Sequence, residues 1–167
     1  MSRVRGSELS PRFVLKPGGP AVIITDAALA TMNRFRQIRP RDKEAGGQLF
    51  ALFDGADTVI VEATPPKSTD YRARREFRPN RWLQQREIRD RHARGSHFVG
   101  DWHTHPEPVP RPSTEDIGNM MECFSQSQHD LHVFVMLIIG TEPAPKGLHV
   151  ALTDQYFFRR LIVDPSA

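Results

Sequence analysis

Apolar residues gather along the chain into short runs with the length and composition of strands, separated by polar segments. The run 48–53 is apolar nearly throughout and the run 58–63 is rich in β-branched residues. The turn signal Asp54-Gly55 lies between them, so the two runs predict a hairpin. Further strands are predicted at 98–103, 131–139, 148–153 and 156–163. Residues 21–24 predict a short strand or the approach to a helix.

Helices are predicted where the apolar spacing lengthens to three or four residues. Asp26 is expected to cap a first helix, and Pro40 is expected to end it. The apolar positions of this helix are Leu29, Met32 and Phe35. Residues 81–94 have helical composition, with Gly95 as a stop signal, and residues 113–128 predict a third helix.

Strands and helices follow one another without strict alternation. This order predicts an α/β chain of the mixed α+β kind, with a central mixed sheet flanked by helices. A chain of 167 residues is long enough for one domain and short for two. Residues 1–20, which contain Gly18, Gly19 and Pro20, are expected to form an N-terminal lead-in to a single domain over 21–167.

The composition is that of a globular protein without membrane segments, with 38% hydrophobic and 26% charged residues. The longest apolar run, 133–139, is far shorter than the ~20 residues that span a bilayer. No apolar segment follows the charged N-terminus, so no secretory signal is recognised. These features predict a cytoplasmic protein that does not bind membranes.

The single cysteine, Cys123, restricts the kind of metal site that the chain can build. One thiol excludes an internal disulfide and the cysteine-pair zinc sites of small structural domains. A metal here must therefore be bound by imidazole and carboxylate groups, a ligand set typical of catalytic zinc.

Nine arginines fall between residues 72 and 94, in a chain with a formal charge of +3. Such a stretch can contact nucleic acid or an acidic protein. Glu76, Glu87 and Asp90 are interleaved with the arginines, however, and no nucleic-acid-binding motif accompanies them. We therefore interpret the stretch as a solvated helix rather than a nucleic-acid interface.

The segment 101–116 carries the candidate chemistry. Alternate side chains of a strand share a face, so His103 and His105 are expected to point the same way and Trp102 and Thr104 the other. The α-carbons of the two histidines lie roughly 7 Å apart at ~3.3 Å per residue, which lets both imidazoles reach one ion. Asp101 shares their face, where we expect a salt bridge; orienting a metal ligand is the alternative.

A proline-rich connection leads from the histidines into the third helix. Prolines occupy positions 106, 108, 110 and 112 and prevent the strand from continuing. Ser113 is a good N-cap, and Asp116 lies in the first turn, where its carboxylate can face back toward the histidines. The apolar stripe of this helix is Ile117, Met120, Met121 and Phe124.

Each piece also has a purely structural interpretation. Ser113 and Asp116 can form a capping arrangement favoured by the helix dipole, and a His-x-His pair alone is weak evidence for a metal. We interpret Met120, Met121, Cys123 and Phe124 as core residues. The other histidines, at 92, 97, 129, 132 and 149, lack ligand spacing and are expected at the surface or as satisfied core residues.

Together the pieces resemble a family signature. His-x-His-Pro, followed after seven residues by Ser-x-x-Asp, resembles the JAB/JAMM (MPN-type) zinc metalloproteases, over residues 22 to about 160. The upstream glutamate of that family resembles Glu44, which precedes Ala45-Gly46-Gly47 and would otherwise be read as an exposed loop carboxylate. The resemblance implies a JAB/MPN fold, which is cytidine-deaminase-like, and one zinc ion per chain.

The resemblance also assigns roles to residues. It implies that His103, His105 and Asp116 bind Zn2+, that Glu44 is the general base, and that the hydroxyl of Ser113 lies near the oxyanion. Family members cut the amide bond after the C-terminal glycine of ubiquitin or a ubiquitin-like modifier. A zinc nucleobase deaminase is disfavoured, because the chain has no Pro-Cys-x-x-Cys partner for its histidines.

The segment 102–107 looks like that of stand-alone bacterial JAB peptidases in anti-phage operons of the CBASS type. That likeness implies an isopeptidase acting on a protein conjugate or C-terminal peptide, with E1/E2-like enzymes and a conjugated nucleotidyltransferase as partners. Three alternatives stay open: a sulfur-carrier processing hydrolase of the same family, a non-catalytic MPN scaffold, and a nucleic-acid-binding protein that uses the arginines.

Overall fold

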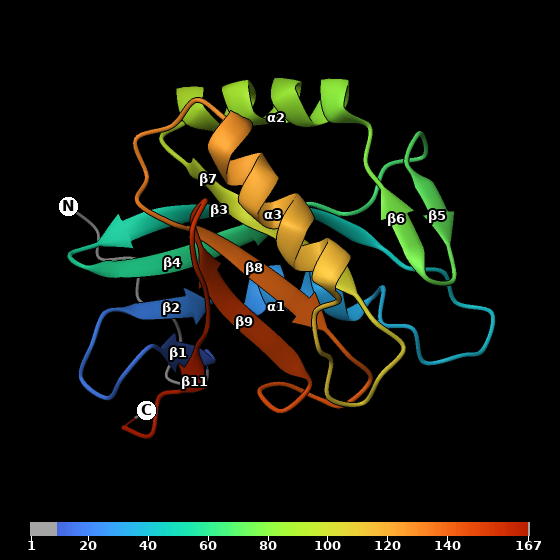
Figure 1. Cartoon of the computed structure of the whole chain (residues 1–167), viewed down its shortest axis with the longest axis horizontal. Coiled ribbons are helices and arrows are strands. Elements are labelled where there is room, and N and C mark those ends of the chain that lie inside the picture. Colours follow the sequence, from blue (N-terminus) through green and yellow to red (C-terminus); the bar gives the residue numbers. More distant parts are fainter. Residues whose placement is uncertain (1–9, 167) are drawn as a thin grey trace.

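A mixed sheet of nine strands forms the centre of the molecule, in a computed structural model that describes residues 10–166 (Figure 1). The strand order is β10-β9-β8-β7-β3-β4-β2-β1-β11, and a separate two-stranded hairpin, β5-β6, lies beside it. The strands are β1 (Arg12–Val14), β2 (Ala21–Ile24), β3 (Gly46–Asp54), β4 (Asp57–Ala63), β5 (Tyr71–Ala73), β6 (Glu76–Arg78), β7 (His97–Thr104), β8 (Phe134–Ile139), β9 (Leu148–Thr153), β10 (Phe158–Arg160) and β11 (Ile162–Val163). The pairs β7–β8 and β2–β4 are parallel and the other neighbours antiparallel, which confirms the predicted mixed sheet.

Three helices cover the sheet: α1 (Asp26–Asn33), α2 (Arg81–Ala93) and α3 (Thr114–Gln126). Helix α1 buries Ala28 and Met32 in the larger core cluster, which includes Trp102 of β7. Helix α3 buries Met120 in a second cluster with Met136 and Ile138 of β8. Because neighbouring residues of a strand face opposite ways, these clusters lie on opposite faces of the sheet. Figure 1 shows α3 in front of the sheet and α1 behind it.

The first helix differs from the prediction at both ends. Its N-cap is Thr25, whose side chain accepts a hydrogen bond from the backbone N–H of Ala28, so Asp26 is the first helical residue and not the cap. The helix ends at Asn33, well before Pro40. Phe35 therefore lies beyond the helix, where its ring packs 6.3 Å from the ring of Trp102.

Strands near both limits of the described residues belong to the sheet. Strand β1 lies within the segment 1–20 and pairs with β2 and β11, so the sheet begins earlier than residue 21; residues 1–9 lie outside the described residues. The predicted strand 156–163 is two short strands at opposite edges of the sheet, β10 beside β9 and β11 beside β1. The chain crosses between the edges at Leu161, whose backbone N–H donates to Val150.

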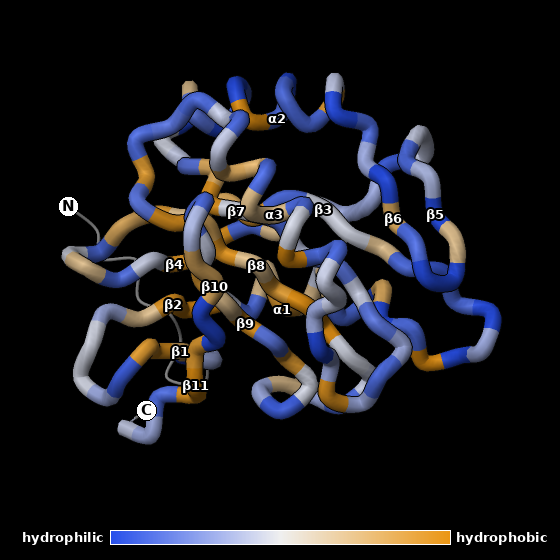
Figure 2. Tube along the Cα trace, in the orientation of Figure 1, coloured by the Kyte–Doolittle hydropathy of each residue, from blue (hydrophilic) through white to orange (hydrophobic). Residues whose placement is uncertain are grey.

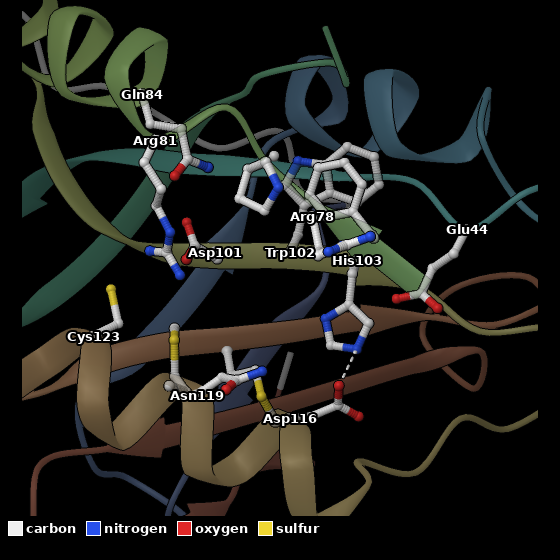
Figure 3. Close-up of a pocket in the computed structure, with 15 residues that line it drawn as sticks. Glu44, Arg78, Arg81, Gln84, Asp101, Trp102, His103, Asp116, Asn119 and Cys123 are labelled. Atoms are coloured by element: carbon white, nitrogen blue, oxygen red, sulfur yellow. Dashed lines mark ion pairs between the residues drawn. The ribbon is translucent and has the colours of Figure 1, made fainter. Parts of the chain in front are cut away.

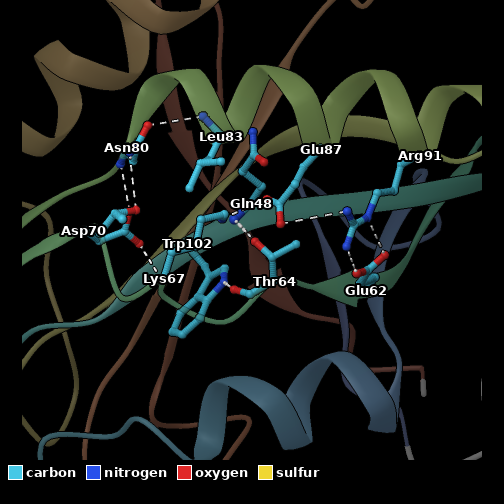
Figure 4. Close-up of polar contacts among 11 residues, drawn as sticks. Gln48, Glu62, Thr64, Lys67, Asp70, Asn80, Leu83, Glu87, Arg91 and Trp102 are labelled. Carbon is cyan, nitrogen blue, oxygen red and sulfur yellow. Dashed lines mark hydrogen bonds and ion pairs between the residues drawn. The ribbon is translucent and has the colours of Figure 1, made fainter.

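Polar contacts fix the start of α2 and attach the helix to β4 and to the loop after β4 (Figure 4). Asn80 caps the helix, Arg91 forms an ion pair with Glu62 at 2.6 Å, and Lys67 pairs with Glu87 at 2.7 Å. Gln84 is the only residue of α2 that is fully buried. Helix α2 confirms a solvated helix over residues 81–93, and Figure 2 shows it as mostly hydrophilic. For the earlier part of the stretch the expectation is wrong, because the arginines at 72, 74, 75 and 78 lie in the hairpin of β5 and β6. None of the described helices combines the length and apolar character needed to cross a bilayer.

Close contact between β7 and β8 depends on Gly100. Its φ is +146°, and a Cβ at this position would lie 1.9 Å from the carbonyl oxygen of Val135. Gly118 in α3 is the opposite case, because a Cβ there would meet nothing within 4 Å. The two glycines therefore form a matched pair for testing the sheet geometry.

We expect Gly100→Ala to lower the free energy of unfolding by about 3 kcal/mol, through backbone strain and collision with β8. Gly118→Ala is expected to raise it by about 0.5–1 kcal/mol, since alanine is favoured over glycine within a helix. Urea unfolding followed by circular dichroism measures both. Equal effects of the two substitutions would contradict the close β7–β8 contact.

Candidate functional site

The two histidines of the motif meet at the end of β7. His103 is the penultimate residue of β7, and His105 is the first residue after the end of that strand. Their Nε2 atoms lie 3.2 Å apart and their ring centroids 4.9 Å apart. Trp102 and Thr104 are buried on the other face, so the predicted alternation of side chains is confirmed.

Asp116 reaches both histidines from the first turn of α3. Its Oδ1 lies 3.4 Å from Nε2 of His103, and its Oδ2 lies 3.4 Å from Nε2 of His105. The structural interpretation of this residue also holds, because Ser113 and Asp116 form a capping box. The backbone N–H of Ser113 donates to Asp116 Oδ2 at 2.7 Å, and the backbone N–H of Asp116 donates to the Ser113 hydroxyl at 3.0 Å. One carboxylate thus caps the helix and contacts both imidazoles.

The pairing of β3 with β7 places Glu44 next to the two histidines. Gly46 pairs with His103, and the backbone N–H of Thr104 donates to the carbonyl of Ala45 at 2.8 Å. The Thr104 hydroxyl in turn accepts from the backbone N–H of Ala45 at 3.0 Å. Glu44 is buried, and its carboxylate shares one cluster with the two imidazoles, with ligand atoms all within 4.8 Å of one another. The alternative of an exposed loop carboxylate is therefore wrong.

The spacing of the nitrogen and oxygen atoms fits a zinc ion. Tetrahedral zinc with ligands at about 2.0–2.1 Å separates neighbouring ligand atoms by about 3.3–3.4 Å. The two imidazole Nε2 atoms lie 3.2 Å apart, and each lies 3.4 Å from one oxygen of Asp116, that of His103 from Oδ1 and that of His105 from Oδ2. Two imidazoles and a carboxylate are also a donor set that catalytic zinc uses, with a fourth position left for water or substrate.

The charges of the site depend on one another. Burial opposes ionisation of Asp116, but hydrogen bonds from His103 and His105 outweigh it and hold the pKa of this carboxyl well below its usual value. Burial also opposes charge on His105, yet Asp116 outweighs it and raises the pKa of that imidazole. Burial raises the pKa of Glu44, with partial opposition from the two histidines. The group formed by His103, His105 and Asp116 therefore favours the binding of positive charge, either a proton or a metal ion.

A cleft of about 360 Å³ opens beside His103 (Figure 3). It lies between α3, the start of α2 and the β6 strand, and this volume is within the range of small-ligand sites. Besides Glu44, His103 and Asp116, its polar lining includes Arg78, Arg81, Gln84, Asp101, Asn119 and Cys123. Figure 3 shows Arg81 and Asp101 at the far end of the cleft from Glu44.

Several cleft residues differ from the sequence interpretation. No ion pair of Asp101 within 4.0 Å exists among the described residues, so the expected salt bridge is wrong. Its buried Oδ1 has no hydrogen-bond partner, and burial raises its pKa to about 6. Arg78 and Arg81 belong to the arginine stretch that the sequence predicts to be solvated, but they line the cleft, and no sequence pattern indicates this. Cys123, interpreted as core, is half-buried at the cleft wall.

His149 also departs from the expectation of a satisfied core residue. It is 4% exposed, and neither of its ring nitrogens has a hydrogen-bond partner among the described residues. It lies in the same cross-strand row as His103, because both pair with Ile138. Burial lowers its pKa to about 4, so this imidazole is neutral at physiological pH.

Sequence comparison connects this geometry to known proteins. The profile of a family described as prokaryotic homologs of the JAB domain matches residues 27–153. A CD-NTase/cGAS isopeptidase of Escherichia coli (strain TW11681) is 30% identical over 125 residues, covering 73% of this chain and 71% of the relative. A CD-NTase/cGAS isopeptidase of Enterobacter hormaechei subsp. hoffmannii (strain UCI 50) is 34% identical over 110 residues, covering 60% and 57%.

Two further comparisons agree with these. A probable metalloprotease of Sinorhizobium fredii, y4qB, is 40% identical over 88 residues, which is half of each chain. Among solved structures, protein DSY2949 of Desulfitobacterium hafniense matches with a TM-score of 0.56 and 24% identity, covering 82% of this chain and 88% of that one. The structural likeness supports the fold alone.

We expect the purified chain to hold about one zinc ion, and we expect His103→Ala and Asp116→Ala to lose most of it. Each substitution removes one of three converging ligand atoms. Inductively coupled plasma mass spectrometry after dialysis measures the zinc content. His132→Ala is the matched control, because His132 is exposed and outside the cluster. Equal zinc content in all the variants would place the metal elsewhere.

Proposed function

Because this chain belongs to the family of prokaryotic JAB-domain proteins, we propose that it is a zinc metallo-isopeptidase that releases a protein conjugated through its C-terminus. The observation that carries the proposal is the convergence of His103, His105, Asp116 and Glu44 at one end of an open cleft. Two imidazoles and two carboxylates suit metal-assisted hydrolysis of an amide bond.

His103, His105 and Asp116 would hold the zinc ion. When bound, zinc supplies Lewis acidity, which makes water a competent nucleophile near neutral pH. Glu44 is the general base: its carboxylate takes a proton from the attacking water and later delivers it to the leaving amine. Its burial supports this role, because a raised pKa brings the acid closer to the pH at which both transfers occur.

Ser113 is proposed to stabilise the negative charge that develops on the carbonyl oxygen. Its hydroxyl oxygen accepts the backbone N–H of Asp116, which leaves its own hydrogen available for donation. The capping box also fixes the direction of this hydroxyl. One such donor commonly contributes about 3–4 kcal/mol to the stabilisation of a developing oxyanion.

The relatives favour one class of substrate within the family. Two of them are named CD-NTase/cGAS isopeptidases and match most of the described chain. We propose that this chain likewise detaches a conjugated nucleotidyltransferase in a bacterial anti-phage system of the CBASS type. E1/E2-like conjugating enzymes would then supply the substrate. This naming favours a conjugate over a sulfur-carrier protein, for which the described site would use the same chemistry.

Glu44→Gln is expected to lower kcat by about 10²–10⁴-fold, because the amide cannot accept the proton of the attacking water. Zinc content is expected to stay near that of the unsubstituted chain, since Glu44 is proposed to act as a base. The assay follows release of a protein from an isopeptide conjugate by gel electrophoresis. Glu115→Gln is the matched control, because this neighbouring acid is exposed in the same turn as Asp116. Full activity of Glu44→Gln, or of zinc-free protein, would refute the mechanism.

A further inference from the structure

A second cleft, of about 390 Å³, lies on the other side of the segment that carries Glu44. It is formed by the loop that follows α1 and by one side chain of β5. Figure 2 shows most of this loop as hydrophilic. The lining residues are Asn33, Arg34, Phe35, Arg36, Ile38, Arg39, Asp42, Lys43 and Arg72. The proposed isopeptidase chemistry makes no use of this cleft.

The lining is strongly and unevenly charged. It contains five cations and a single acid, Asp42. Oδ2 of Asp42 already accepts the backbone N–H of Arg39 at 2.8 Å. None of the five cations takes part in an ion pair within residues 10–166. Elsewhere in residues 10–166 the half-buried cations are paired, whereas the two half-buried cations of this cleft, Arg36 and Arg72, are not.

Two of the arginines are brought together by one aromatic ring. The guanidinium of Arg34 lies 5.8 Å from the ring centroid of Phe35, and that of Arg72 lies 5.7 Å from it. Arg72 is also fixed by the backbone, because its Nε donates to the carbonyl of Glu44 at 2.9 Å and its Nη2 to that of Lys43 at 3.2 Å. Holding like charges near one ring costs electrostatic free energy, which a bound anion recovers.

Arg36 adds a positive charge with a fixed position to the same lining. Its Nη1 donates to the carbonyl of Thr141 at 3.1 Å, which holds the side chain in place. Its Nε is buried and has no hydrogen-bond partner among the described residues. The bond to Thr141 keeps the positive charge of this guanidinium at the cleft, where a bound anion would offset it.

We propose that this cleft binds a small phosphate-bearing anion with at least two phosphate groups. Five cations around one concave site of this size match several phosphate oxygens, and guanidinium groups bind phosphate through paired hydrogen bonds. A cleft volume of about 390 Å³ favours a small molecule over a folded partner. Arg72 links the site to the active-site segment, because the carbonyl oxygens that it holds belong to Lys43 and Glu44.

Isothermal titration calorimetry with pyrophosphate at 0.15 M salt tests the proposal. Inorganic phosphate, ATP and adenosine serve as comparison ligands, to separate the phosphate groups from the nucleoside. We expect saturable binding of pyrophosphate and of ATP, weaker binding of phosphate, and no binding of adenosine. Binding of adenosine as tight as that of ATP, or no saturable binding of pyrophosphate, overturns the proposal.

A charge-reversed variant locates the binding. The double substitution Arg34→Glu and Arg39→Glu is expected to weaken pyrophosphate binding at least about tenfold, because two cations that attract the phosphate groups are replaced by anions that repel them. The matched control is Arg89→Glu with Arg94→Glu, which makes the same charge change on exposed positions of α2 and at its end. Equal weakening by the two pairs would mean a diffuse charge effect and overturns the proposal.

Pyrophosphate can also bind zinc, so a third variant separates the two sites. His103→Ala removes a proposed zinc ligand and leaves the basic cleft intact. We expect pyrophosphate binding to persist in this variant. Its loss in His103→Ala, together with its retention in the Arg34/Arg39 variant, would assign the binding to the metal site and refute the second cleft.

Discussion

The register between β3 and β7 is the constraint on which the candidate site depends. Pairing Gly46 with His103 places the residue two positions earlier, Glu44, beside the imidazoles. Thr104 fixes this register from the opposite face, where its hydroxyl accepts from Ala45 and donates to Gln37. A shift of the pairing by one residue would turn Glu44 away from the histidines, because neighbouring side chains of a strand face opposite ways. The buried hydrogen bonds of Thr104 therefore keep Glu44 beside the histidines, although Thr104 itself does not face the candidate site.

Much of the fold could be predicted from local patterns, because they determine local structure. The hairpin of β3 and β4 and the capped helix α3 follow from turn and cap residues whose effects extend over a few positions. Strands β1, β5 and β6 were not recognised, since three-residue strands carry too little pattern. The first helix was predicted too long because Phe35 continues the apolar spacing while packing on Trp102 as part of a loop. The histidines and Asp116 lie close in sequence, whereas the place of Glu44 depended on the family signature until the sheet register was known.

The arginines of the chain have different structural roles in the two clefts and in helix packing. Arg78 and Arg81 line the cleft beside His103, and Arg91 stabilises the packing of α2. Arg34 and Arg72 instead meet over Phe35 in the second cleft. Composition alone cannot separate these roles, because they depend on where the fold places each arginine side chain. The segment 42–45 forms the partition between the clefts, with Glu44 facing one and Lys43 the other.

The capping box at the start of α3 has a thermodynamic consequence. Oδ2 of Asp116 accepts the backbone N–H of Ser113 and lies beside His105, so the same atom serves helix initiation and the ion site. Unfolding of the first turn of α3 would move that oxygen away from the histidines. A cation bound to the same oxygen would in turn stabilise the helical turn. Helix order and ion occupancy are therefore linked functions, each reporting on the other even when no substrate is being cut.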